Sequence, residues 1–199
     1  MESKHIIKRA ITTLSRLPGI GERSAQRMVF CLMQKKEPLL LPLIKQLDLL
    51  SQEIKTCEFC NNIDVSNPCN ICSNETRNNK QICVVEDIAS LWALEKSKAF
   101  SGVYFVLEGA LKANNETLTG NKIPQLLNLI NKRQVNEIII ATSLTIEGQT
   151  TALYLKEEIN KLNSTIVVST LAQGVPVGGE IDYLDELTLE TAIKLRKNI

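Results

Sequence analysis

Apolar residues at the front of the chain recur with the 3.6-residue period of an α-helix. Residues 4–17 carry Ile7, Ile11 and Leu14 on one side and basic residues elsewhere, and a similar stripe follows Gly21. Residues 38–56 form a third helical pattern, with more leucine than so small a segment can bury by itself. The pattern therefore predicts three helices, the last of which packs against another module or another chain.

Short apolar runs alternate with helical patterns from Lys80 onward. Strands separated by helices of this length predict right-handed crossovers and a mostly parallel sheet. The predicted strands are residues 82–85, 103–107, 137–141 and 164–169, and the predicted helices are residues 87–96, 123–132, 149–162 and 188–197. We expect an α+β multi-module chain, with a helical front (1–56), a small finger (57–72), an α/β domain (80–175) and a C-terminal strand and helix segment for subunit contacts (176–199).

Charge is distributed unevenly along the chain. Residues 1–56 hold ten Lys and Arg against five Asp and Glu, whereas residues 57–199 hold thirteen against seventeen. A basic front segment is typical of a phosphate-binding module, although a solvated helical face has the same composition. The chain has no apolar run of membrane-spanning length and no secretory start, so we expect a cytoplasmic protein without membrane contact.

Four cysteines follow a C-x2-C-x8-C-x2-C pattern at Cys57, Cys60, Cys69 and Cys72. Two C-x2-C turns can direct four thiolates at one tetrahedral ion, so the spacing predicts a zinc site. Four thiolates close the coordination shell, and the zinc is therefore expected to be structural rather than catalytic. Two disulfides are the alternative. The other two cysteines, at positions 31 and 83, lie on apolar stripes and are expected to be core thiols.

A glycine turn separates the first two predicted helices, in the run Leu-Pro-Gly-Ile-Gly that ends at Gly21. Gly19 and Gly21 permit a tight bend just before a helix N-terminus, where free backbone N–H groups can bind phosphate. Arg23 and Arg27, one helical turn apart, can add charged contacts. The run resembles a helix-hairpin-helix DNA-binding motif, with a plain helix–helix turn as the alternative.

Two acidic positions follow predicted strands of the rear module. Glu86 ends the first strand, and Glu147-Gly148 follows the third. The arrangement resembles a Toprim domain, in which an Asp-x-Asp pair precedes Glu-Gly and helps to hold Mg²⁺. Here Ser143 and Thr145 occupy the two aspartate positions, and neutral hydroxyls are poor ligands for a hard cation. Metal-dependent phosphoryl chemistry is therefore disfavoured, and Glu86 and Glu147 are candidates for an acidic surface that binds a partner.

The order of these motifs resembles the RecR family of bacterial recombination mediators over essentially the whole chain. The hairpin run, the cysteine finger, the Toprim pattern and the run Gly-Val-Pro-Val-Gly-Gly-Glu at residues 174–180 carry the resemblance. It implies a non-catalytic DNA-repair factor with one structural Zn²⁺ per chain. It also implies sequence-independent binding of single- and double-stranded DNA, work with RecF and RecO to help load RecA, and a homotetramer or dimer of dimers.

The chain differs from the family pattern at residues 110–120 and around residues 143–149. A Toprim-type nuclease, topoisomerase or primase-like enzyme therefore stays as an alternative, as does a zinc-dependent adaptor that does not bind DNA. Asp185-Glu186 faintly resembles the end of a Walker B strand, but the sequence contains no phosphate loop, so nucleotide hydrolysis is disfavoured.

Overall fold

Amphipathic helices with short connections make up the front of the protein, as the pattern predicts. The computed structural model describes residues 2–110 and 122–196. Contacts between residues divide the chain into two units, one up to Ile54 and one from Lys55 onward, and the finger belongs to the second. Of the divergent segment 110–120, residues 111–120 lie outside the described residues.

The first unit consists of α1 (Glu2–Leu14), α2 (Glu22–Gln34), the π-helical turn η1 (Lys36–Leu40) and α3 (Leu41–Glu53). α1 packs against α2, where Ala25 and Val29 are buried. No residue of α3 is buried, and Leu47 and Leu50 are each 54% exposed. The third helix therefore has the surplus apolar surface that the sequence predicts.

The expectation for Cys31 is wrong, because its side chain is exposed. At 100° per residue, Cys31 lies on the far side of α2 from Ala25 and Val29. A two-helix contact buries only one narrow stripe, and this cysteine falls outside it.

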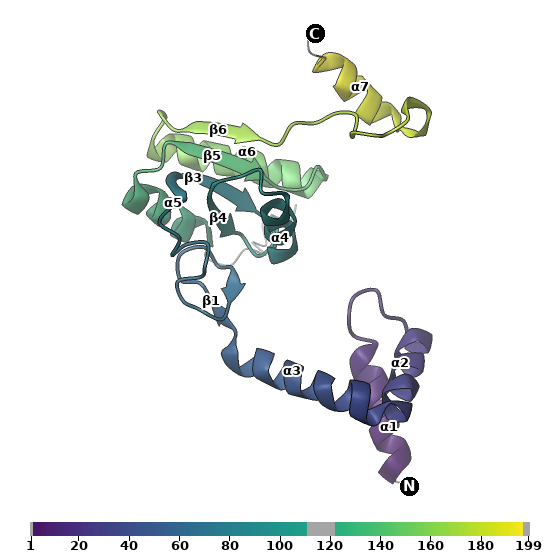
Figure 1. Ribbon diagram of the computed structural model, residues 1–199. Helices are drawn as coiled ribbons and strands as arrows, with labels where there is room; N and C mark the ends of the chain where they lie inside the picture. The colour runs from purple at the N-terminus through teal and green to yellow at the C-terminus, as the bar shows by residue number, and fades with distance from the viewer. Residues whose placement is uncertain (1, 111–121, 197–199) are drawn as a thin grey trace. The chain divides into compact units, whose positions relative to one another are not determined.

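A four-stranded sheet in the order β4-β3-β5-β6 forms the centre of the second unit (Figure 1). All three pairings are parallel, which confirms the mostly parallel sheet. Its elements in chain order are β3 (Asn78–Val85), α4 (Ile88–Ser97), β4 (Gly102–Val106), α5 (Lys122–Arg133), β5 (Glu137–Ala141), α6 (Ile146–Leu162) and β6 (Val167–Thr170).

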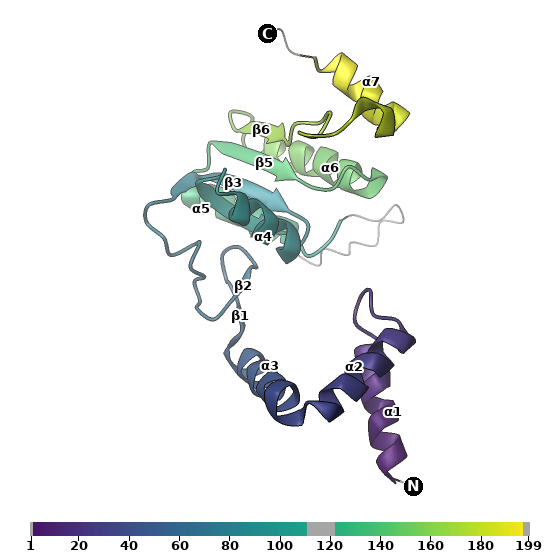
Figure 2. The same ribbon diagram turned by 45° about the vertical axis from the view of Figure 1, so that its right-hand side comes forward.

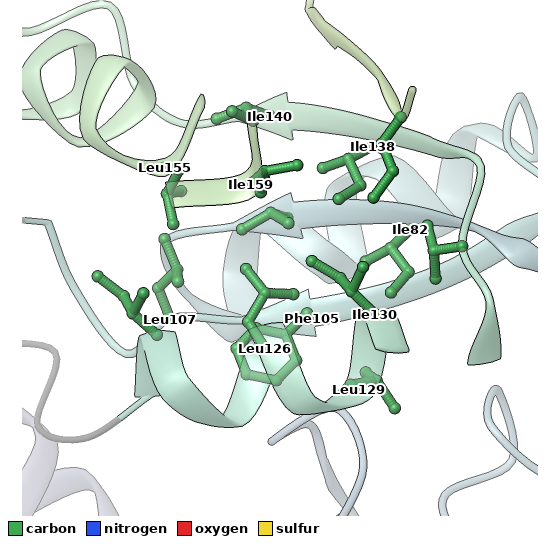
Figure 3. Close-up of a cluster of buried hydrophobic side chains, with 14 of the residues drawn as sticks. Ile82, Phe105, Leu107, Leu126, Leu129, Ile130, Ile138, Ile140, Leu155 and Ile159 are labelled. Carbon is green, nitrogen blue, oxygen red and sulfur yellow. The ribbon is translucent and has the colours of Figure 1, made fainter. Parts of the chain in front are cut away.

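Alternating residues of β3 pack into two separate apolar clusters, one on each face of the sheet. Ile82 and Val84 join the cluster that α5 and α6 cover, whereas Cys83 and Val85 join the cluster that includes Leu91 of α4. Figure 3 shows side chains of α5 and α6 directed at strand residues in the larger cluster. Both faces of the sheet are therefore buried, as expected for parallel strands.

Among the element boundaries that differ from the prediction, two differ because short polar side chains bond to nearby backbone. α6 begins at Ile146, three residues earlier than expected, since the side chain of Thr145 caps its N-terminus. β6 begins at Val167, three residues later than expected. The preceding residues form a turn in which the side chain of Asn163 accepts a hydrogen bond from the backbone N–H of Thr165 at 3.0 Å.

The end of the chain consists of a short 3-10 helix, η2 (Ile181–Tyr183), and α7 (Glu186–Lys194). Asp185 caps α7 by accepting a hydrogen bond from the backbone N–H of Thr188 at 2.9 Å. The faint Walker B resemblance is therefore wrong, since Asp185 begins a helix instead of ending a strand. Among the described residues, no helix is long and apolar enough to cross a membrane.

Candidate metal centre and nucleic-acid interface

The finger begins with β1 (Lys55–Thr56) and β2 (Ile63–Asp64), an antiparallel ribbon (Figure 2). The backbone N–H of Asn61 donates to the carbonyl of Cys57 at 3.0 Å, and that of Ser73 donates to the carbonyl of Cys69 at 3.0 Å. Each C-x2-C pair is thus closed into a turn that presents its two thiols on one side.

The four predicted ligands come together. The Sγ atoms of Cys57, Cys60, Cys69 and Cys72 all lie within 4.8 Å of one another, and the first three residues are fully buried. A tetrahedral ion with metal–sulfur bonds of about 2.3 Å separates its sulfurs by roughly 3.8 Å, so the cluster has the right size. All four cysteines are free, and Cys60 Sγ lies 3.5 Å from Cys69 Sγ, which is a hydrogen-bond distance. This arrangement favours the metal site over the disulfide alternative.

The close packing of the four thiols shifts the pKa values of two of them in opposite directions. The hydrogen bond between Cys60 and Cys69 raises the pKa of Cys60 and lowers the pKa of Cys69. A cluster that already favours a thiolate at Cys69 is suited to a cation. The pKa of Cys83 rises to about 12 for a different reason, since burial in the sheet disfavours its thiolate.

The finger joins the open edge of the sheet at β4. The backbone N–H of Val106 donates to the carbonyl of Cys60 at 2.8 Å, and the side-chain amide of Asn61 donates to the carbonyl of Val106 at 3.2 Å. Asn61 also accepts a hydrogen bond from the ammonium group of Lys122 at 3.1 Å and donates to Gln125 Oε1 at 3.3 Å. These contacts occupy backbone groups that an edge strand otherwise exposes.

Asn61 is a residue that the sequence prediction missed. It is 3% exposed and has a φ of 60°, a left-handed conformation that asparagine tolerates better than most residues. Its position directly after the second cysteine of a C-x2-C turn is the signal, because the chain must reverse there.

The hairpin between α1 and α2 has the open geometry that anion binding requires. Gly19 has a φ of +77°, which favours glycine, whereas Gly21 has an ordinary φ of −76°. Gly21 is the N-cap of α2, and no side chain caps this N-terminus. A Cβ atom added at either glycine would meet no described atom within 4 Å. Packing within the protein therefore does not require a glycine at position 21. A ligand that approaches the backbone closely at this position would require one.

Arg23 and Arg27 are both exposed on α2, and neither takes part in an ion pair with another described residue. Glu22 in the first turn opposes anion binding, and the two guanidinium groups outnumber it. The hairpin thus offers free backbone N–H groups and two unpaired cations on one short stretch.

Glu86 lies where β3 and β5 end side by side, at the point where the strand order reverses. Its Oε1 atom accepts hydrogen bonds from the backbone N–H of Ser143 at 2.9 Å and from Ser143 Oγ at 2.8 Å. Ser143 Oγ lies 3.0 Å from Thr145 Oγ1, which in turn accepts from the backbone N–H of Gly148 at 3.2 Å. Ser143 thus holds the carboxylate of Glu86 through two hydrogen bonds, and Thr145 contacts Ser143 rather than Glu86.

Glu147 has a different environment from Glu86. It is exposed at the start of α6, next to Ile146, which is 82% exposed, and close to the exposed Leu144. Among the described residues, the four cysteines form the only group of His, Cys, Asp or Glu side chains suited to a metal ion. Among those described residues, the carboxyl end of the sheet therefore has no cluster of side chains that could hold a metal ion.

Three family models match the chain in succession. They are the RecR helix-hairpin-helix over residues 7–49, the Toprim domain over residues 80–172, and the RecR C-terminal region over residues 174–197. "Recombination protein RecR" of Orientia tsutsugamushi strain Boryong is 44% identical over 199 residues, which cover 99% of this chain and 97% of that protein.

Two further relatives carry the same name. The protein of Bartonella henselae strain Houston 1 is 43% identical over 202 residues, with 99% and 100% coverage of the two chains. That of Methylorubrum extorquens strain PA1 is 46% identical over 194 residues, with 96% and 94% coverage.

Proposed function

This chain belongs to the RecR family of recombination proteins, and on that premise we propose that it is a DNA-binding mediator of repair that has no catalytic cycle. The observation that carries the proposal is the uncapped N-terminus of α2 at Gly21. Backbone N–H groups at such a position bind phosphate oxygens of either single- or double-stranded DNA without reading the bases.

Arg23 and Arg27 test the DNA-binding part of the proposal. In an Arg23→Ala/Arg27→Ala variant, the salt dependence of DNA binding should weaken by about 1.4 to 1.8 in the slope of log K against log salt, because two phosphate contacts are lost. The matched control is Lys35→Ala/Lys36→Ala, which removes the same charge from exposed positions of the same unit. An unchanged slope in the arginine variant would remove the hairpin from the mechanism.

The bonding of Glu86 supports the absence of catalysis. A two-metal phosphoryl-transfer site needs clustered anionic oxygens, and here one carboxylate bonds to the hydroxyl of Ser143, which in turn lies beside that of Thr145. The rival is a Toprim-type nuclease, topoisomerase or primase-like enzyme. Purified protein incubated with Mg²⁺ and supercoiled or nicked DNA should leave the DNA unchanged, and cleavage or relaxation would establish the rival.

The metal held by the four cysteines is, in this proposal, one structural Zn²⁺ per chain. The closed set of four thiolates leaves no position for a reacting water, so the ion would stabilise the finger and take no part in chemistry. Elemental analysis should give one zinc per chain. An adaptor that holds zinc but does not bind DNA would give the same metal content and no mobility shift with DNA.

Family membership supplies the proposed partners, RecO and RecF, and the outcome, loading of RecA onto single-stranded DNA in the bacterial cytoplasm. Glu86 and Glu147 are the candidate partner contacts. The exposed Glu147 is the more accessible of the two, because Glu86 is engaged by Ser143. Glu147→Gln should weaken RecO binding in a pull-down while leaving DNA binding unchanged.

We also propose a homotetramer or dimer of dimers. Exposed apolar side chains on α3 and along the C-terminal segment, among them Leu47, Val177 and Leu187, support subunit contacts at both ends of the chain. Several hairpins in one particle would bind DNA far more tightly than one. Light scattering coupled to size exclusion should show four chains, and a monomer at micromolar concentration would contradict this part of the proposal.

A further inference from the structure

An open groove of about 450 Å³ runs along α1. It is lined by His5, Lys8, Arg9, Thr12, Thr13 and Arg16, all of them exposed. Every lining residue is polar, and three carry a permanent positive charge. We call this surface the α1 groove.

Helix geometry explains why these residues share one side. Positions 5, 9 and 12 are separated by three or four residues and therefore form one stripe of α1, and Arg16 follows two residues after the helix ends. The stripe lies opposite the half-buried Ile7, Ile11 and Leu14. With a rise of 1.5 Å per residue, His5 and Arg9 stand about 6 Å apart along the helix axis. The α1 groove therefore points away from the apolar side of the helix.

The positive charge of the α1 groove is not balanced locally. No Asp or Glu occurs between Glu2 and Glu22 in the sequence. None of the groove cations belongs to an ion pair between described residues. Such a surface concentrates anions, and its potential extends over about a Debye length.

We propose that the α1 groove binds a second stretch of nucleic-acid backbone, with Lys8, Arg9 and Arg16 contacting phosphates and Thr12 adding a hydroxyl contact. The inference rests on the DNA binding proposed above and extends it beyond the hairpin. Arg and Lys pair with phosphates, and threonine hydroxyls are common phosphate ligands. A protein partner would need apolar or aromatic anchors, and none lines the groove.

Continuity with the hairpin supports this occupant. Arg16 directly precedes Leu17, where the hairpin run begins, so the groove and the glycine turn meet in sequence. Within α1, from residue 5 to residue 13, the groove spans about 12 Å of helix axis, which is roughly the rise of three to four nucleotides in one strand of B-DNA, and Arg16 follows in the turn after the helix. In this proposal, a backbone bound at Gly21 continues past Arg16 and along α1.

The test compares three variants of the full-length protein for binding to oligo-dT by fluorescence anisotropy at several salt concentrations. The groove variant is Lys8→Gln/Arg9→Gln/Arg16→Gln, and the hairpin variant is Arg23→Ala/Arg27→Ala. The matched control, Lys35→Gln/Lys36→Gln/Lys45→Gln, removes three exposed charges of the same unit outside the groove. Glutamine has nearly the helix propensity of the residues replaced, so α1 should persist, and circular dichroism checks this.

Loss of three single-strand phosphate contacts should reduce the slope of log K against log salt by about 2. With binding at 1 M salt unchanged, this corresponds to about 100-fold weaker binding at 0.1 M salt. The control variant should bind as the unaltered protein does.

The outcomes separate the two proposals. If the groove variant binds oligo-dT as well as the control while the hairpin variant does not, the groove inference fails and the proposed function stands. If the unaltered protein does not bind oligo-dT at all, the proposed function fails first. Unchanged DNA binding together with lost affinity for poly-glutamate would show that an acidic protein occupies the groove, and would overturn the inference.

Discussion

Replacing Asn61 by alanine should destabilise the second unit by about 4 kcal/mol. The change removes three hydrogen bonds, to Val106, Gln125 and Lys122, at distances of 3.2, 3.3 and 3.1 Å. At about 1 kcal/mol each, their loss accounts for about 3 kcal/mol. Alanine in the left-handed conformation, with φ near 60°, adds about 1 kcal/mol relative to asparagine.

Asn61→Gly is the matched variant, since it removes the same hydrogen bonds but tolerates the positive φ. It should unfold with a free energy about 1 kcal/mol above that of Asn61→Ala, because the relief of strain exceeds the entropy that glycine adds to the unfolded chain. The difference between the two variants isolates the backbone strain from the hydrogen bonds.

Urea denaturation followed by tryptophan fluorescence measures both free energies. The chain has a single tryptophan, Trp92 in α4, so the signal reports the second unit alone. The buffer contains zinc throughout to keep the finger loaded. A loss below about 1 kcal/mol for Asn61→Ala, or equal stability of the two variants, would refute the view that Asn61 fastens the finger to the sheet.

Three further outcomes are expected. Ser143→Asp/Thr145→Asp should lower Tm in zinc-containing buffer without Mg²⁺, through carboxylate repulsion, and should recover it in 10 mM Mg²⁺. A Mg²⁺-dependent rise in Tm of the unaltered protein would show that a cation site already exists. Gly148→Ala should lower the free energy of unfolding, measured in urea, by about 2 kcal/mol, because the added Cβ would lie 2.2 Å from the carbonyl oxygen of Ser143. Gly21→Ala should leave that free energy unchanged, because a Cβ there meets only open space. In the zinc-loaded protein one thiol per chain, that of the exposed Cys31, should react rapidly with a thiol reagent. Chelation should raise the number of fast thiols to five, while the buried Cys83 stays slow. Two fast thiols before chelation would contradict the burial described.

Periodicity and spacing were sufficient to predict the elements whose signals are local. The apolar run ending at Val85 is buried on both faces, so its sequence predicts a parallel strand without knowledge of its neighbours. The four cysteines were predicted from spacing alone, because a C-x2-C turn brings its own thiols together. Cys31 shows the limit of periodicity, since an apolar stripe does not say how wide the packed contact is.

Contacts between distant residues could not be predicted in the same way. The sequence shows that Ser143 and Thr145 replace aspartates, but not that Glu86 bonds to Ser143, since that contact depends on the pairing of β3 with β5. Asn61 was missed because its partners lie 45 to 64 residues away. The groove on α1 could not be predicted either, because identifying it requires the ends of the helix and the exposure of its side chains.

The position of the finger at β4 links the lifetime of the protein to metal supply. Removal of the proposed cation would release the four cysteines at the centre of the finger, and the hydrogen bonds that join Val106 to Cys60 and Asn61 should then break. The edge strand β4 would then expose unpaired backbone N–H and C=O groups, which can form a sheet with a strand of a neighbouring molecule. In a metal-starved cell the protein should therefore aggregate through the second unit, although the hairpin lies in the other unit and takes no part in the metal site.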